Sequence, residues 1–186
     1  HVPEDRMTHG CAPTLGIEAN LMSYNHGHPE YSGPVLFRSA AIRSRSAQLI
    51  KEYNVKCSSP EQEVGMLSGG NIQKVVVARE FSSDPSLIVA DQPTRGIDVG
   101  ATEFIRARLV QLRDAGAAVL LVSADLNEVM ELSDSLLVMY GGHITAYIPD
   151  AASVTEEELG LYMLGLKKQD ATETGRAIHD NAATAV

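Results

Sequence analysis

Short apolar runs alternate with amphipathic segments along most of this 186-residue chain. Residues 86–90 and 117–123 are almost continuously aliphatic, which is typical of buried strands, and the second run predicts a central parallel strand. Segments with apolar side chains at helical spacing lie before, between and after these runs. The order strand, helix, strand, helix, strand predicts an α/β fold with parallel strands.

Several helices are expected from the same pattern. Residues 100–115 have an apolar side, and Gly116 is placed to end that helix. Ser153 and Glu156 have the spacing of a capping box, which predicts a last helix that ends near Lys167. The other expected helices cover residues 17–22, 39–53, 69–82 and 125–132.

The C-terminal third is expected to contain a hairpin and a tail. Residues 135–140 and 143–148 flank Gly141-Gly142, and a glycine pair supplies the positive φ angles of a two-residue turn. Residues 168–186 are polar and rich in Ala and Thr, which predicts a flexible tail.

A serine and two glycines at the start of the helix 69–82 predict an anion site. They belong to the segment Leu67-Ser68-Gly69-Gly70-Asn71. Glycine lets a backbone approach a phosphate closely, and the helix dipole adds roughly half a positive charge to the free N–H groups of the first turn. The alternative is a plain helix N-terminus capped by Ser68.

A second candidate site follows the first apolar run. The strand expected before it ends in Asp91, and a carboxylate at the tip of a parallel strand suits Mg²⁺ that is carried by a nucleotide. The alternative is an aspartate that only caps a turn. The segment Gln92-Pro93-Thr94-Arg95-Gly96-Ile97-Asp98 comes next.

Taken in order, these motifs resemble the ATP-binding subunits of ABC transporters. Residues 67–71 with Gln73, and residues 92–101, are similar to the branch that serves simple sugars and nucleosides, whose subunits carry two nucleotide-binding domains in one polypeptide. The resemblance covers about residues 1–150. It implies a partial P-loop NTPase (ABC ATPase) domain of α/β class, the C-terminal part of the second domain, with a helical subdomain but without its N-terminal phosphate-loop part.

The resemblance implies four parts. Residues 1–82 would be a Q-loop remnant and the helical subdomain, ending in the signature helix. Residues 83–150 would be the α/β core with the Walker B, D-loop and H-loop regions. Residues 151–167 would be a C-terminal helix, and residues 168–186 the tail.

The family also implies roles for particular residues. Residues 67–71 form the signature motif, which with Gln73 would act in trans on the γ-phosphate of ATP held by a second nucleotide-binding domain. Asp91 would position Mg²⁺ through water. Asp98 would be the D-loop acid that touches the other domain, and it can also cap the helix that follows.

Four departures from the family concern this domain's own site. No Gly-x-x-x-x-Gly-Lys-Ser/Thr loop occurs, so the chain alone cannot hold the β- and γ-phosphates and is expected to be inactive. Gln92 stands at the catalytic Glu position and cannot accept a proton, a function typically worth about 10²–10⁴ in rate. Ala124 stands at the switch His position, and Glu4 at the Q-loop glutamine. We therefore expect an asymmetric pair of ATP sites.

Composition narrows the class of protein. The formal net charge of -9 argues against nucleic acid as a partner. No apolar run is long enough to span a membrane. The resemblance implies a peripheral protein at the cytoplasmic face of the membrane. The two cysteines suggest reduced thiols, although a disulfide stays open. The chain does not begin with Met and is expected to be a piece of a longer protein.

Partners follow from the resemblance: a second nucleotide-binding domain, transmembrane permease subunits and, indirectly, a periplasmic or lipoprotein substrate-binding protein. Two alternatives are a non-catalytic regulatory half-domain and a soluble ABC ATPase without a permease. We also expect the isolated chain to dimerise or aggregate, because a sheet without its neighbouring strands exposes apolar surface.

Overall fold

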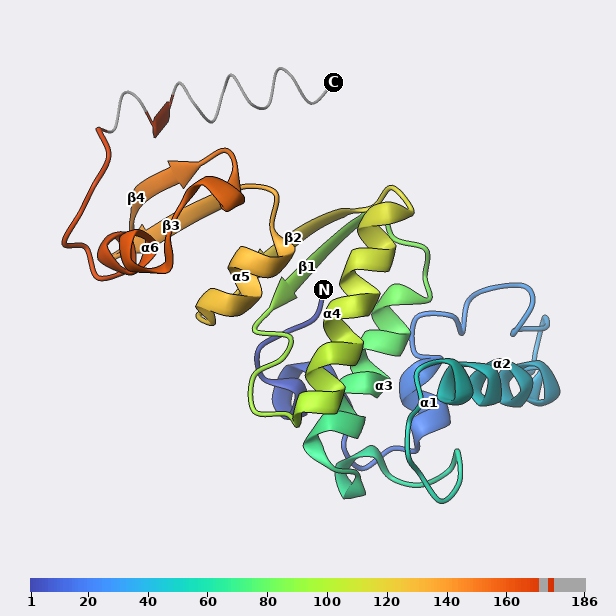
Figure 1. The fold of residues 1–186 in the computed structure, drawn as a ribbon. Helices are drawn as coiled ribbons and strands as arrows, with labels where there is room; N and C mark the ends of the chain where they lie inside the picture. The colour runs from blue at the N-terminus through green and yellow to red at the C-terminus, as the bar shows by residue number, and fades with distance from the viewer. Residues whose placement is uncertain (171–173, 176–186) are drawn as a thin grey trace. The chain divides into compact units, whose positions relative to one another are not determined.

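The computed structural model describes residues 1–170 and 174–175 (Figure 1). The chain forms two compact units with the boundary after Val122. The expected mixture of helices and strands is confirmed, and the first two strands are parallel. The third strand of the expected order, residues 136–140, pairs antiparallel with residues 143–148 instead. The four parts implied by the resemblance stay a prediction.

A small parallel sheet lies in the first unit. Strands β1 (Leu87–Asp91) and β2 (Ala118–Val122) pair in register along their whole length (Figure 1). On the other edge of β1, Val2 forms a single parallel bridge with Ala90. The N–H group of Val2 donates to Val89 O at 2.8 Å, so β1 lies between this N-terminal segment and β2.

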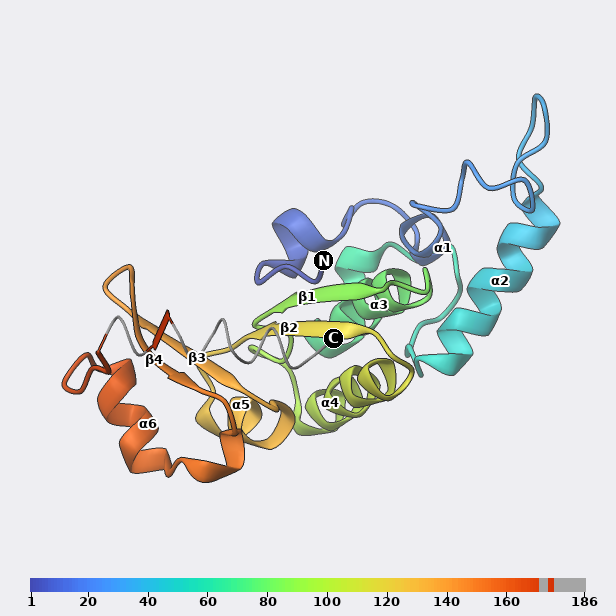
Figure 2. The same ribbon diagram turned by 90° about the horizontal axis from the view of Figure 1, so that it is seen from above.

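Helix α3 (Gly69–Phe81) forms the core of the first unit. Eleven of its 13 residues are buried, including every residue from Ile72 onward, because other elements surround it (Figure 2). The surrounding elements are the π-helical turn η1 (Arg6–Gly10), α1 (Ile17–Leu21), α2 (Ser39–Glu52), the 3₁₀ turn η2 (Val64–Met66) and α4 (Val99–Asp114). None of the helices in the described ranges combines the length and apolar character needed to cross a bilayer.

One face of the sheet is open, contrary to what its aliphatic sequence predicts. The strand β2 is confirmed, but its Leu120 side chain is 56% exposed and Val122 is 46% exposed. Helix α4 packs against β2, and among the described residues β1 is the only strand beside it. A run of aliphatic residues therefore predicted the strand correctly and its burial wrongly.

The second unit is a hairpin covered by a helix. Strands β3 (Leu136–Tyr140) and β4 (His143–Ile148) are antiparallel, and Gly141 and Gly142 both have positive φ, which confirms the expected turn. The short helix α5 (Leu126–Leu132) precedes the hairpin. Helix α6 (Glu156–Met163) follows the 3₁₀ turn η3 (Ala151–Ser153). The core contains Leu136, Val138, Ala146, Ile148, Leu159 and Tyr162.

Both ends of α6 differ from the prediction. The N-cap is Thr155, whose Oγ1 accepts from Glu158 N at 3.2 Å, because Ser153 already closes η3. The helix ends at Met163 rather than near Lys167. Gly165 adopts φ +70°, and the N–H group of Leu166 donates back to Leu161 O at 2.9 Å, which is a Schellman termination.

Part of the expected tail is attached to β4. The N–H group of Gln169 donates to Thr145 O at 2.9 Å, and the side chain of Gln169 accepts from Tyr147 N at 2.8 Å. Residues 171–173 and 176–186, which make up most of the predicted tail, lie outside the described residues.

Candidate functional site

The start of α3 has no side-chain cap. Ser68 occupies the N-cap position and is exposed, but its hydroxyl makes no capping hydrogen bond. Instead, Ser68 Oγ accepts from Asn71 Nδ2 at 2.9 Å, and Asn71 Oδ1 accepts from Lys56 N at 2.8 Å. The expected alternative of a serine-capped helix is therefore not observed. No side-chain cap competes with an anion at this end of the helix.

Packing inside the chain leaves little room for a side chain at the glycine pair of the signature segment (residues 67–71). A Cβ atom on Gly69 would lie 3.0 Å from Arg6 Nη2. A Cβ atom on Gly70 would lie 2.6 Å from Asp98 Oδ2 and 3.0 Å from Ala101 Cβ. The sequence predicts only that these glycines let a phosphate approach the backbone closely. The structure adds that a Cβ atom on Gly70 would collide with Asp98, whereas one on Gly69 would meet only the far end of the Arg6 side chain.

Asp98 caps α4 with one oxygen and faces α3 with the other. Its Oδ1 accepts from Ala101 N at 3.0 Å, and its backbone carbonyl accepts from Thr102 N at 2.9 Å. The capping role expected for Asp98 is confirmed. Its Oδ2 lies against Gly70, so the same carboxylate joins the starts of two helices. A contact of Asp98 with another domain stays a prediction.

Gln73 is a buried residue of α3. Its side chain is only 2% exposed, and its Nε2 donates to Pro93 O at 2.8 Å. Gln73 Oε1 has no hydrogen-bond partner among the described residues. Within the chain, Gln73 therefore ties α3 to the loop that follows β1.

The loop after β1 begins with a strained residue. Asp91 is half-buried at the C-terminal end of the strand. Gln92 adopts φ +48°, in the left-handed region that costs a non-glycine residue roughly 1–2 kcal/mol, and its N–H group donates to Val122 O at 2.8 Å. Strained backbone of this kind is common at functional sites. The two residues at the expected Mg²⁺ and catalytic positions thus lie side by side at the sheet edge.

Asp91 is the one carboxylate that the sequence predicts for Mg²⁺ at this end of the sheet. Within the described ranges, no three His, Cys, Asp or Glu side chains come together in a way that could hold a metal ion. A single carboxylate such as Asp91 fits Mg²⁺ that arrives with nucleotide phosphates, because Mg²⁺ is commonly held by one or two carboxylates plus substrate oxygens. Ala124 is exposed and belongs to the second unit.

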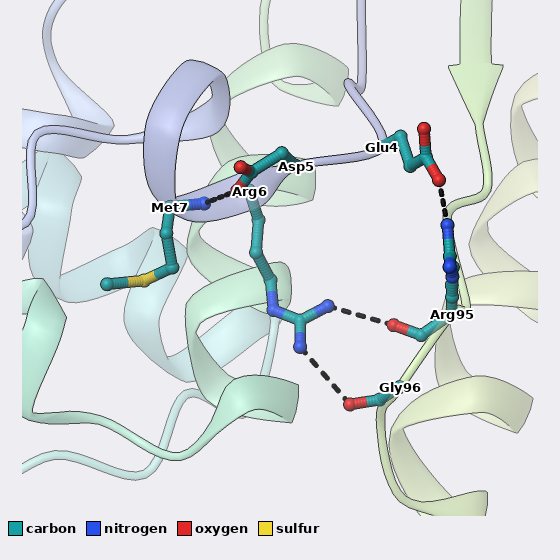
Figure 3. A pocket seen from close by; sticks show the side chains of 6 residues that line it. All are labelled: Glu4, Asp5, Arg6, Met7, Arg95 and Gly96. Carbon is teal, nitrogen blue, oxygen red and sulfur yellow. Dashed lines mark hydrogen bonds and ion pairs between the residues drawn. The ribbon is translucent and has the colours of Figure 1, made fainter.

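The N-terminal segment contributes a residue that the sequence interpretation missed. Arg6 Nη1 donates to Arg95 O at 2.9 Å, and Arg6 Nη2 donates to Gly96 O at 3.1 Å (Figure 3). The Glu4 carboxylate pairs with the Arg95 side chain. Glu4, which stands at the Q-loop glutamine position, is therefore paired with a cation. Nothing in the local sequence distinguishes Arg6 from the other arginines of the chain.

Asp5 holds the backbone turn that places Arg6. Its Oδ1 accepts from Met7 N at 2.9 Å (Figure 3). The same oxygen accepts from Thr8 N at 3.0 Å. Hydrogen bonding from Thr8 lowers the pKa of the Asp5 carboxyl below its ordinary value. The carboxylate form is therefore favoured, and it caps η1.

Solved structures identify the fold. A dimeric ATP-binding cassette in a post-hydrolysis state with ADP and Pi matches with a TM-score of 0.59 and 23% identity, over 74% of this chain and 57% of that chain. An ATP-binding subunit of an ABC transporter matches with a TM-score of 0.60 and 21% identity, over 96% of this chain and 67% of that chain. The chain therefore has the ABC ATPase fold, of the P-loop NTPase type.

Sequence relatives narrow the class. The guanosine import ATP-binding protein NupO of Bacillus subtilis (strain 168) is 39% identical over 92% of this chain and 33% of its own length. The nucleoside import ATP-binding protein NupA of Lactococcus lactis is 37% identical over 89% and 32%. The arabinose import ATP-binding protein AraG of Vibrio parahaemolyticus is 40% identical over 88% and 32%. No family model matches the chain.

This chain is thus a homologue of the ATP-binding proteins of sugar and nucleoside import. It spans about a third of the length of these relatives.

Proposed function

We propose that this chain is part of an ATP-binding subunit that energises import of simple sugars or nucleosides by an ABC transporter. Its signature segment acts in trans on ATP held by a second nucleotide-binding domain. The observation that carries the proposal is the start of α3, where Ser68 is exposed and no side-chain cap occupies the helix end. A helix N-terminus of this kind attracts anions through its free N–H groups and its dipole.

The proposed residues divide between two ATP sites. Ser68, Gly69, Gly70 and Asn71 serve the partner's ATP, with Leu67 preceding them and Gln73 supporting them from below. Asp98 contributes at the boundary with the partner domain. All the residues of the helix start that would form the trans site therefore belong to this chain.

This domain's own site is weaker. Asp91 would hold Mg²⁺ through water, and Mg²⁺ when bound supplies positive charge to the phosphate oxygens. Gln92 offers an amide where a carboxylate could accept a proton, and the methyl side chain of Ala124 cannot hydrogen-bond a γ-phosphate. Glu4 pairs with Arg95. These residues would support nucleotide binding more than hydrolysis, which makes the two sites unequal.

The partners follow from the same assignment. An import ATPase needs a second nucleotide-binding domain and permease subunits, and it depends indirectly on a substrate-binding protein. Its place would be the cytoplasmic face of the membrane, as a peripheral subunit. A second candidate, a non-catalytic regulatory half-domain, is favoured by the amide of Gln92 and would need only the binding role of this domain.

The first test compares two identical changes in the complete protein. Ser68→Arg puts a bulky cation at the helix start, whereas Ser44→Arg makes the same change at an exposed position on α2. We expect steady-state ATP hydrolysis to fall by at least about 10²-fold in Ser68→Arg, the scale of losing one group that stabilises a transition state, and to stay unchanged in Ser44→Arg.

The size of the loss separates the hypotheses. Complete loss means that hydrolysis occurs only at the site completed by Ser68, as the asymmetric pair requires. A loss of about half means that two equal sites turn over independently, which contradicts the asymmetry. Unchanged hydrolysis in Ser68→Arg would exclude the trans role and leave the regulatory half-domain as the better assignment.

A further inference from the structure

We infer that Arg6 is a positioning residue, which fixes the start of α3 and the loop 95–98 relative to each other. The inference rests on the proposed function, since these two segments carry Ser68 and Asp98. Arg6 itself does not have to touch ATP. It acts by keeping the groups that face the partner domain in one arrangement.

The guanidinium group of Arg6 joins three segments that are distant in sequence. It donates to the carbonyl groups of Arg95 and Gly96, 89 and 90 residues further along the chain (Figure 3). Its Nη2 also lies beside Gly69, where a Cβ atom would come within 3.0 Å. One side chain therefore contacts both the signature segment and the loop after β1.

The loop 95–98 presents two acceptor groups that a single guanidinium can reach. Gly96 adopts φ +66°, a conformation that glycine reaches without steric cost, and two consecutive carbonyl groups accept from the same guanidinium. A planar guanidinium can donate two hydrogen bonds in a fixed fork, whereas an ammonium group cannot reproduce this geometry. The two carbonyl acceptors therefore favour an arginine at position 6, and a positive charge alone would not replace it.

The base of the Arg6 side chain is also fixed. Asp5 caps the turn η1 through the N–H groups of Met7 and Thr8. At the other end of the turn, a Cβ atom on Gly10 would lie 3.2 Å from Val76 Cγ2, so η1 packs closely on α3. Arg6 thus reaches from a turn anchored on α3 to the loop beyond it.

The glycine pair lies between two charged groups as a result. The Arg6 guanidinium adjoins Gly69, and the Asp98 carboxylate adjoins Gly70. Displacement of the loop would move Asp98 away from the helix start. Because a shift of about 1 Å in a reacting arrangement can cost as much as 10²-fold in rate, the fork should matter for turnover.

The test uses the complete protein and paired substitutions. Arg6→Gln removes the fork and the charge, and Arg6→Lys keeps only the charge. Arg43→Gln and Arg43→Lys are the matched controls at an exposed position on α2. The kcat and KM for ATP are measured with amide hydrogen exchange of residues 68–72 and 95–99.

We expect kcat to fall about 10–10²-fold in Arg6→Gln while KM changes less than about threefold. Hydrogen exchange should become faster in the two segments and stay unchanged in β1, β2 and the body of α4. Arg6→Lys should show an intermediate kcat. The Arg43 controls should keep kcat within about twofold, because Arg43 is exposed on α2 and belongs to neither segment.

Three outcomes would overturn the inference. The first is full kcat in Arg6→Gln while Ser68→Arg is inactive, which leaves the proposed function standing. The second is faster exchange throughout residues 1–122, which would make Arg6 a general stabilising residue. The third is full kcat in Arg6→Lys, which decides the case if Arg6→Gln does not fold. Full activity in both Ser68→Arg and Arg6→Gln would instead reject the proposed function.

Discussion

At the scale of single residues, there are two separate reasons for a glycine at position 70. A helix start that faces an anion benefits from a residue without a side chain, because the backbone is then open to the ligand. The packing against Asp98 and Ala101 demands the same residue for a different reason, since a Cβ atom would have no space. Loss of Gly70 should therefore weaken the fold even where no nucleotide is bound.

Gly70→Ala should destabilise the chain by about 1–3 kcal/mol, the usual cost of an added group in a packed site. The matched control is Gly100→Ala, at the start of α4, where the nearest atom, Asp98 Oδ1, would be 3.5 Å from the new Cβ. This control should stabilise the chain by about 0.5–1 kcal/mol. Urea unfolding followed by circular dichroism measures both changes. Equal midpoints would mean that Asp98 moves aside without cost.

At the scale of elements, the ends of helices depend on single backbone conformations. Helix α4 ends where expected, because Gly116 adopts φ +98° directly after its last turn. Helix α6 ends earlier than its sequence predicts, because Gly165 reverses the chain against Tyr140. A glycine ends a helix where it adopts positive φ, as Gly116 and Gly165 do, whereas Gly160 lies inside α6. The glycine that ends α6 lies inside a segment that was expected to be helical.

Gly165→Ala should destabilise the second unit strongly. Alanine at φ +70° costs roughly 1–2 kcal/mol, and its Cβ would lie 2.3 Å from the Tyr140 ring. Gly160→Ala, within α6 itself, is the control, because its Cβ would meet nothing within 4 Å. We expect this control to gain about 0.5–1 kcal/mol. Hydrogen exchange of β3 and β4 compares the two, and slower exchange in Gly165→Ala would contradict the Schellman termination.

At the scale of the whole molecule, the open face of the β1–β2 sheet has a consequence for solution behaviour. The parallel register aligns Leu87 with Ala118, Val89 with Leu120 and Asp91 with Val122. Leu87 is 57% exposed and lies on the same face as Leu120. Apolar side chains gathered on an open sheet favour association with another surface.

The 186-residue chain by itself should therefore self-associate, and Leu120→Lys should shift it toward the monomer. The control is Leu15→Lys, because Leu15 is 52% exposed but lies in a loop away from the sheet. Sedimentation velocity at several concentrations measures the distribution of species. If Leu15→Lys and Leu120→Lys behave alike, the sheet face is not the surface that associates.

Local sequence was enough to predict most elements and the candidate motifs. The periodicity of residues 100–115, the cap at Asp98 and the Gly141-Gly142 turn depend on neighbours within a few positions, so the sequence contains the necessary information. The motif order also pointed to the import ATPases that the relatives represent. These features need no knowledge of how distant segments pack.

Only the tertiary structure decided the rest. Arg6 forms hydrogen bonds with Arg95 and Gly96, which are about half the chain away in sequence. No local sequence pattern predicts such a contact. Whether Ser153 or Thr155 caps α6, and whether Leu120 is buried, depends on which elements compete for the same groups or cover the same face. The sequence by itself determined most of the helices and strands and the position of the signature segment at a helix start, because those follow from local backbone preference. The packing of distant segments determined which side chains hold these turns in place.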